Sequence, residues 1–274
     1  MLALPWFALA EPNTDAARMH HEMAAQVLPA NGYQSKVALG GSVVALTRTG
    51  VIDRKKLETL YAEGGGDPRD LAQLLGQPSF RPILLSATNA RLYVNLLWPL
   101  GLANRMAGNK ASPLNGPDLP NYASTGGWTL GRQRNGAAYF NALPIVPLSS
   151  EQEALVIRVA QHTFRPCCNN SSFFQDCNHG SALLGLLALG ASQGLGEDDL
   201  YREALAFNAF WFPEHYTHIA LYFKVVDGID WRKVDARTAL SANFSSASGM
   251  QANVSRPLQR RGLVPAQSGS QCSA

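Results

Sequence analysis

The fold is decided by the apolar run Ser181-Ala-Leu-Leu-Gly-Leu-Leu-Ala-Leu-Gly-Ala-Ser-Gln193, which follows the polar loop Arg165-Pro-Cys-Cys-Asn-Asn-Ser-Ser-Phe-Phe-Gln-Asp-Cys-Asn-His-Gly180. The run has no polar face, and a helix that is hydrophobic all round is typically buried in a protein core. We therefore predict a buried central helix over about residues 179–193. The preceding loop is then held at the N-terminus of that helix.

This loop is the candidate functional site. Cys167, Cys168, Cys177 and His179 place three thiols and one imidazole within thirteen residues. Thiolate and imidazole ligands select transition metals such as zinc, copper or iron. The spacing departs from the usual zinc pattern, because two adjacent cysteines replace Cys-x2-Cys. We predict a Cys/His metal-binding protein that acts in metal handling or redox chemistry, with a transition metal as its cofactor and ligand.

A cysteine-nucleophile hydrolase is the first alternative. The positive end of a helix dipole lowers the pKa of a nearby thiol, which Cys177 is placed to use, and His215 or His218 would serve as base. Asp176-Cys-Asn-His-Gly180 resembles the Asp-Cys-Gly-plus-helix opening of papain-like, bacteriocin-processing cysteine peptidases. It departs from that pattern by two residues between cysteine and glycine, and Gln175 lies too close to match the oxyanion glutamine. The resemblance is confined to this loop and the start of the helix.

A disulfide is the second alternative. In an oxidising compartment Cys168 and Cys177 would close a small loop, a contribution of roughly 2–3 kcal/mol to stability. The chain would then be a non-enzymatic secreted structural or assembly subunit. Arg165, at the start of the loop, could offset the negative charge of a multi-thiolate centre, but a surface residue at a helix end is the favoured interpretation.

Composition limits the partners. A net charge of +3 on 274 residues, without a basic cluster interleaved with aromatic residues, argues against nucleic-acid binding. The charged fraction of 16% is low, which suits a protein partner, a homo-oligomer or an extracytoplasmic setting. Residues 1–12 read as an apolar N-terminal segment or signal remnant, so a periplasmic or secreted location is expected. No apolar run reaches about eighteen residues, so no membrane span is predicted.

The remaining patterns predict a mainly α-helical protein with minor β structure. A single helical domain over 13–262 is expected, with a flexible tail over 263–274 and a strand near Ser42 or Ile219. Residues 108–149 form a long irregular region whose scattered aromatic residues favour a packed loop over a linker. Ser150 and Glu153 have the spacing of a capping box. Helices are expected from near Asn13 to Val27, after Asp53, and over 68–75, 89–106, 150–163 and 197–211. The segment 214–226 fits both a helix and a strand, and a helix is preferred.

Overall fold

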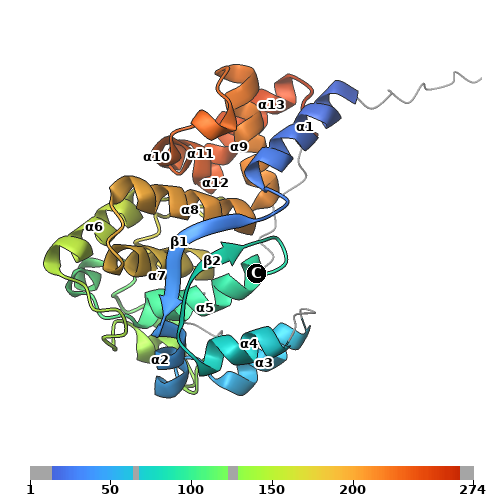
Figure 1. Cartoon of the computed structure of the whole chain (residues 1–274). Helices are drawn as coiled ribbons and strands as arrows, with labels where there is room; N and C mark the ends of the chain where they lie inside the picture. The colour runs from blue at the N-terminus through green and yellow to red at the C-terminus, as the bar shows by residue number, and fades with distance from the viewer. Residues whose placement is uncertain (1–13, 64–67, 123–128, 266–274) are drawn as a thin grey trace, which may run out of the picture.

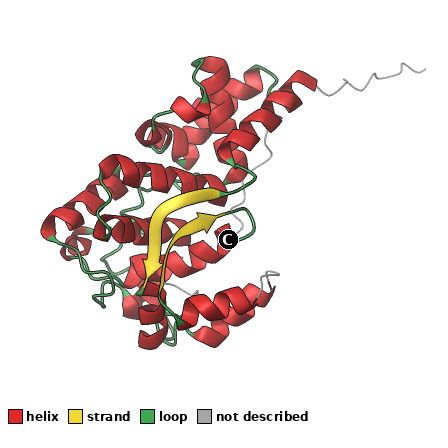
Figure 2. Ribbon diagram, viewed as in Figure 1, coloured by secondary structure: helices red, strands yellow, loops and turns green. Residues whose placement is uncertain are grey.

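The computed structural model describes residues 14–63, 68–122 and 129–265, and helices dominate them, as the mainly α prediction requires (Figures 1 and 2). The first apolar segment, Gly64–Gly66 and most of the C-terminal tail lie outside these residues. In chain order the elements are α1 (Thr14–Val27), β1 (Tyr33–Gly40), α2 (Ser42–Thr49), α3 (Arg54–Glu63), α4 (Pro68–Gly76), β2 (Ser79–Leu85), α5 (Ala90–Ala103), η1 (Ala107–Ala111), η2 (Leu119–Asn121), η3 (Gly136–Tyr139), α6 (Ser150–Gln161), α7 (Asn178–Ser192), α8 (Glu197–Trp211), α9 (Pro213–Val226), η4 (Trp231–Lys233), α10 (Ala236–Ala239), α11 (Ala242–Ser245), α12 (Ala247–Gly249), η5 (Met250–Ser255) and α13 (Arg256–Arg260).

The predicted central helix is confirmed as α7, which is buried along almost its whole length. It packs most closely against α5, and two glycines allow the backbones to touch. A Cβ atom added to Gly101 would lie 1.8 Å from the carbonyl oxygen of Ser181, and one added to Gly185 would lie 2.4 Å from that of Leu97. The Ser181 hydroxyl also donates to the carbonyl oxygen of Trp98 at 2.8 Å. This glycine crossing joins α5 to α7 through backbone contact.

A two-stranded antiparallel sheet lies across these helices, with Tyr33 opposite Leu85 and Gly40 opposite Ser79 (Figure 2). The strand predicted near Ser42 is wrong. That segment is α2, because its apolar residues are buried at helical spacing, and the strand β1 comes directly before it. The ambiguous segment around Ile219 is the helix α9, as preferred from the sequence.

Glu203 of α8 connects β1 to the helical core through hydrogen bonds. Its buried carboxylate accepts hydrogen bonds from the Tyr33 hydroxyl at 3.0 Å, the Ser35 hydroxyl at 2.6 Å and the Lys36 amide at 2.8 Å. Buried charges in proteins require such partners. Burial and this carboxylate together raise the pKa of the Tyr33 phenol.

The described part of the long irregular region, residues 108–122 and 129–149, consists mainly of turns and short 3-10 helices, and it is packed against the core. Tyr139 is buried, and its hydroxyl donates to the carbonyl oxygen of Gly50 at 2.7 Å. The side chain of Asn104, at the end of α5, binds the backbone of Val146 in both directions, at 3.1 and 2.7 Å. These contacts support the packed-loop prediction. Trp128, one of the aromatic residues on which that prediction was based, lies outside the described residues.

The chain beyond Gly228 reads as a polar loop in the sequence, but it forms the short helices η4 to α13. They pack with α1 and α9 into the upper part of the molecule in Figure 1. Side chains of Asp230, Asp235 and Ser246 cap three of them, so residues that look like turn formers act as helix caps.

The start of α6 differs from the prediction by one residue. Its capping box is formed by Ser149 and Gln152, each side chain bonding the backbone of the other, rather than by Ser150 and Glu153. The carboxylate of Glu153 instead accepts the amide of Gly108 in the irregular region. Within the described residues, no helix is both long and apolar enough to cross a membrane.

Candidate metal centre at the start of α7

Cys177 occupies the N-cap of α7. Its sulfur accepts a hydrogen bond from the Gly180 amide at 3.4 Å, in the place that a serine or aspartate side chain commonly takes. Unpaired amides and the helix dipole favour negative charge at this position. The local fold therefore directs the thiol of Cys177 to a site that stabilises a thiolate.

The loop before α7 brings the other cysteines to this thiol. The Sγ atoms of Cys167 and Cys177 are 3.7 Å apart, and with a ring nitrogen of His179 they form a set of atoms within 4.8 Å of one another. A second such set contains Cys168, Asp176 and Cys177. The four predicted ligands thus fall into two overlapping sets that share Cys177. The three cysteines are free thiols.

Arg165 contacts this centre through Cys177 and is fully buried, so the expectation of a surface arginine is wrong. Its Nε donates to Cys177 Sγ at 3.0 Å, and Nη1 donates to the carbonyl oxygen of Asn170 at 2.8 Å. Its Nη2 donates to the carboxylate of Asp176, which also accepts from the Asn170 side chain at 2.6 Å. A burial pattern cannot be read from one arginine next to a proline, so charge balance by Arg165 was only the less favoured interpretation of the sequence.

Hydrogen bonding distributes charge unequally among the three thiols. Bonds from the Cys167 and Cys168 thiols, with the Arg165 charge and a bond to His179, hold the pKa of Cys177 well below its usual range. Hydrogen bonds with the other two thiols and burial raise the pKa of Cys167. The Cys167 bond lowers the pKa of Cys168, but the Cys177 bond and burial outweigh it and raise that pKa to about 11. These interactions favour the thiolate form at Cys177, whose sulfur lies 3.7 Å from that of Cys167, while the Cys168 thiol donates to the carbonyl oxygen of Asn170 at 3.8 Å.

His179 connects the thiols with a cavity of about 350 Å³. Its ring packs against Phe212 at 4.5 Å and Trp211 at 5.8 Å between ring centres. Asn178 also lines this cavity, and its buried Oδ1 has no hydrogen-bond partner in the described chain. A polar atom of this kind is suited to a small polar ligand or a water molecule.

The two histidines expected as alternative bases have other contacts. The Nε2 of His218 lies 3.0 Å from a carboxylate oxygen of Glu214, and the ring of His215 lies edge-on to Phe212 at 6.1 Å. The imidazole that bonds the Cys177 thiol is that of His179. Cys272 lies outside the described residues.

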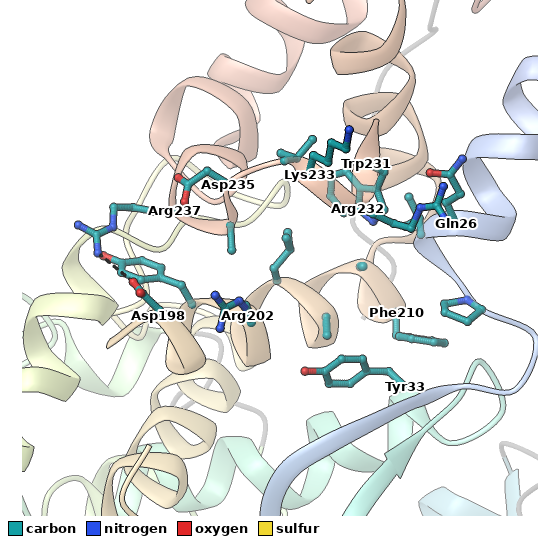
Figure 3. A pocket seen from close by; sticks show the side chains of 18 residues that line it. Gln26, Tyr33, Asp198, Arg202, Phe210, Trp231, Arg232, Lys233, Asp235 and Arg237 are labelled. Atoms are coloured by element: carbon teal, nitrogen blue, oxygen red, sulfur yellow. Dashed lines mark ion pairs between the residues drawn. The ribbon is translucent and has the colours of Figure 1, made fainter. Parts of the chain in front are cut away.

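A larger cavity of about 650 Å³ lies between α8 and the segment 231–237 (Figure 3). Two of its cations pair with acids: Arg202 with Asp199 at 3.0 Å and Arg237 with Glu197 at 2.9 Å. Its lining residues, all in the described chain, include neither cysteine nor histidine. The thiol cluster and the larger cavity therefore lie in separate places, and we locate the candidate site at the thiols.

Comparison of the whole chain with protein-family models, curated proteins and solved structures gives no match. The functional argument therefore depends on the geometry and chemistry of the residues themselves.

Proposed function

We propose that the protein binds a transition metal ion through Cys167, Cys177 and His179, with Cys168 as a neighbouring donor, and acts in metal handling or redox chemistry. The observation that carries this proposal is the 3.7 Å separation of the Cys167 and Cys177 sulfurs. In tetrahedral zinc sites, Zn–S bonds of about 2.3 Å place two sulfurs about 3.8 Å apart. A disulfide would require about 2.05 Å, so the loop has the spacing of a chelating pair.

The charges around the site suit a divalent ion. Two thiolates, on Cys167 and Cys177, balance a divalent cation, and the neighbouring Arg165 and Asp176 balance each other. Binding would require the Cys167 thiol to lose its proton, since thiolates rather than thiols are metal ligands. When bound, the metal would supply Lewis-acid or redox chemistry according to its identity.

The three-residue ligand set leaves room for a further ligand. Metal sites with three protein ligands and one open position are typical of catalytic rather than purely structural zinc centres. The cavity lined by His179 and Asn178 offers space for a small polar molecule beside the set. Cys168 is the competing fourth ligand, and a site closed by it would favour metal storage or transfer.

A cysteine nucleophile is the second candidate, and the lowered pKa of Cys177 favours it. In that mechanism the Cys177 thiolate would attack the carbonyl carbon of an acyl substrate and form a thioester as the leaving group departs with a proton from His179. Water, deprotonated by His179, would then hydrolyse the thioester and restore the thiolate. Arg165 would stabilise the thiolate through its 3.0 Å hydrogen bond. The neighbouring Cys167 would then act only as a hydrogen-bond donor.

Metal analysis of the full chain, purified without chelator, together with a free-thiol count, separates these functions. At the thiols we expect about one metal per chain, in addition to any ion bound elsewhere, with the clustered thiols protected from alkylation. Cys177→Ser and His179→Ala should bind this one ion at least about tenfold more weakly. Cys272→Ser, which removes a cysteine outside the loop, is the control and should keep the wild-type ratio.

Other results of the metal analysis and the thiol count would support a different function. An unchanged metal ratio in Cys177→Ser would refute the assigned ligands. A metal-free protein in which Cys177 alone reacts rapidly with iodoacetamide at mildly acidic pH would support the nucleophile. A metal-free protein with two thiols missing would support the disulfide and a structural role.

A further inference from the structure

A second cluster of metal-binding side chains lies between α1 and α9, helices from distant parts of the chain. One carboxylate oxygen of Glu214 is 3.0 Å from Nε2 of His218 and 3.3 Å from Nε2 of His20. The two imidazole rings meet edge to face, with 5.6 Å between their centres. One potential ligand atom from each of the three residues lies within 4.8 Å of the other two.

These separations match the edges of a coordination polyhedron. With metal–nitrogen and metal–oxygen bonds of about 2.1 Å, neighbouring ligand atoms lie about 3.0 Å apart at right angles and about 3.4 Å apart at the tetrahedral angle. The two measured nitrogen–oxygen distances fall at and between these values. A metal ion can therefore bind with small side-chain movements.

Local structure explains how the three groups meet. Glu214 and His218 are four residues apart on α9 and so lie on the same face of that helix. His20 reaches them from α1, which packs along α9 (Figure 1). The side chain of His218 is only 6% exposed at the base of the cluster, whereas that of Glu214 is 61% exposed, so the cluster opens to solvent.

We propose that His20, Glu214 and His218 form a second metal site, specific for a divalent transition ion and independent of the thiols. Two imidazoles and one carboxylate suit zinc, cobalt, nickel or iron(II), whereas calcium and magnesium prefer oxygen ligands. Three protein ligands leave positions for water.

Occupation of this site would join α1 to α9. Because the ligands come from both helices, a bound ion stabilises their packing and the folded state as a whole. This gives the proposal a readout besides stoichiometry. His21, adjacent in sequence but exposed and outside the cluster, provides the matched control.

The test is a cobalt(II) titration of the full chain, followed by equilibrium dialysis and visible and ultraviolet absorption. Cobalt at the thiols produces thiolate-to-metal charge-transfer absorption, and cobalt at the histidines does not. We expect His20→Ala and His218→Ala to bind one cobalt fewer than His21→Ala, or to bind it at least about tenfold more weakly, with the thiolate absorption unchanged.

Thermal unfolding provides the second measurement. Cobalt should raise the unfolding midpoint of His21→Ala more than that of His20→Ala, whose partly exposed histidine can be removed without opening the core. Equal cobalt binding and equal midpoint shifts in these two variants would overturn the proposal. Absence of thiolate-to-cobalt absorption in the wild type would count against the cysteine centre but not against the histidine site. The two sites are therefore tested separately.

Discussion

Arg165 shows how a single residue links stability to chemistry. Its guanidinium is fully buried and donates to a thiolate, a carboxylate and a backbone carbonyl. Burial alone would favour its neutral form, but the surrounding sulfurs and Asp176 outweigh that effect and raise its pKa, so the positive charge persists. The loop around Cys177 therefore folds about a fixed cation.

Replacing Arg165 by glutamine should destabilise the protein by about 3–5 kcal/mol, because Asp176 and Cys177 would keep buried negative charges without their partner. Denaturant unfolding of wild type and variant measures this loss. Arg158→Gln is the control: it breaks a surface pair with Glu197 at 3.0 Å and should cost no more than about 1 kcal/mol. Similar losses in both variants would contradict a structural role for the buried charge.

Residue types indicate candidate ligands, but only the folded structure shows their neighbours. The sequence identified Cys167, Cys168, Cys177 and His179 as candidates because thiols and imidazoles close in sequence are informative by themselves. It favoured a surface position for Arg165 and missed the partnership of His20 with α9, because both depend on tertiary packing.

At the scale of elements, α6 provides a direct check of helix capping. Ser149→Ala should lower stability by about 1 kcal/mol, because the serine oxygen bonds the Gln152 amide at 3.3 Å. Ser150→Ala, at the first helical position, should change stability by less than about 0.5 kcal/mol. Urea unfolding of the two variants tells the two registers apart, and a larger loss for Ser150→Ala would favour the register predicted from the sequence.

Long helices were predictable because their apolar spacing is a local signal. The bounds of α1, α8 and the central helix agree closely with the patterns and caps that predicted them. The strand β1 was missed because its pairing partner β2 lies far along the chain, and because Gly40 at its end and the flanking Gly32 and Gly41 suggest a loop. The short helices after Gly228 were missed because each has too few residues to show a period.

At the scale of the whole molecule, the glycine crossing between α5 and α7 is the least tolerant point of the core. In Gly185→Ala the new methyl would lie 2.4 Å from the carbonyl oxygen of Leu97, and neither backbone can move independently. We expect a loss of at least about 1–3 kcal/mol, measured by thermal or denaturant unfolding. Gly76→Ala, at the end of α4 with no atom within 4 Å of the new Cβ, should be neutral or slightly stabilising.

The same crossing also bears on how the cysteine loop opens, because Cys177 lies at the start of α7 whereas Cys167 and Cys168 precede it. Cys177 belongs to α7, whose amide protons should exchange with solvent only when the whole molecule unfolds. Cys167 and Cys168 lie on a segment of turns rather than on a helix, so we expect local opening there to cost less free energy than unfolding of α7. The cluster would then open first on the side of Cys167 and Cys168, while Cys177 stays in α7.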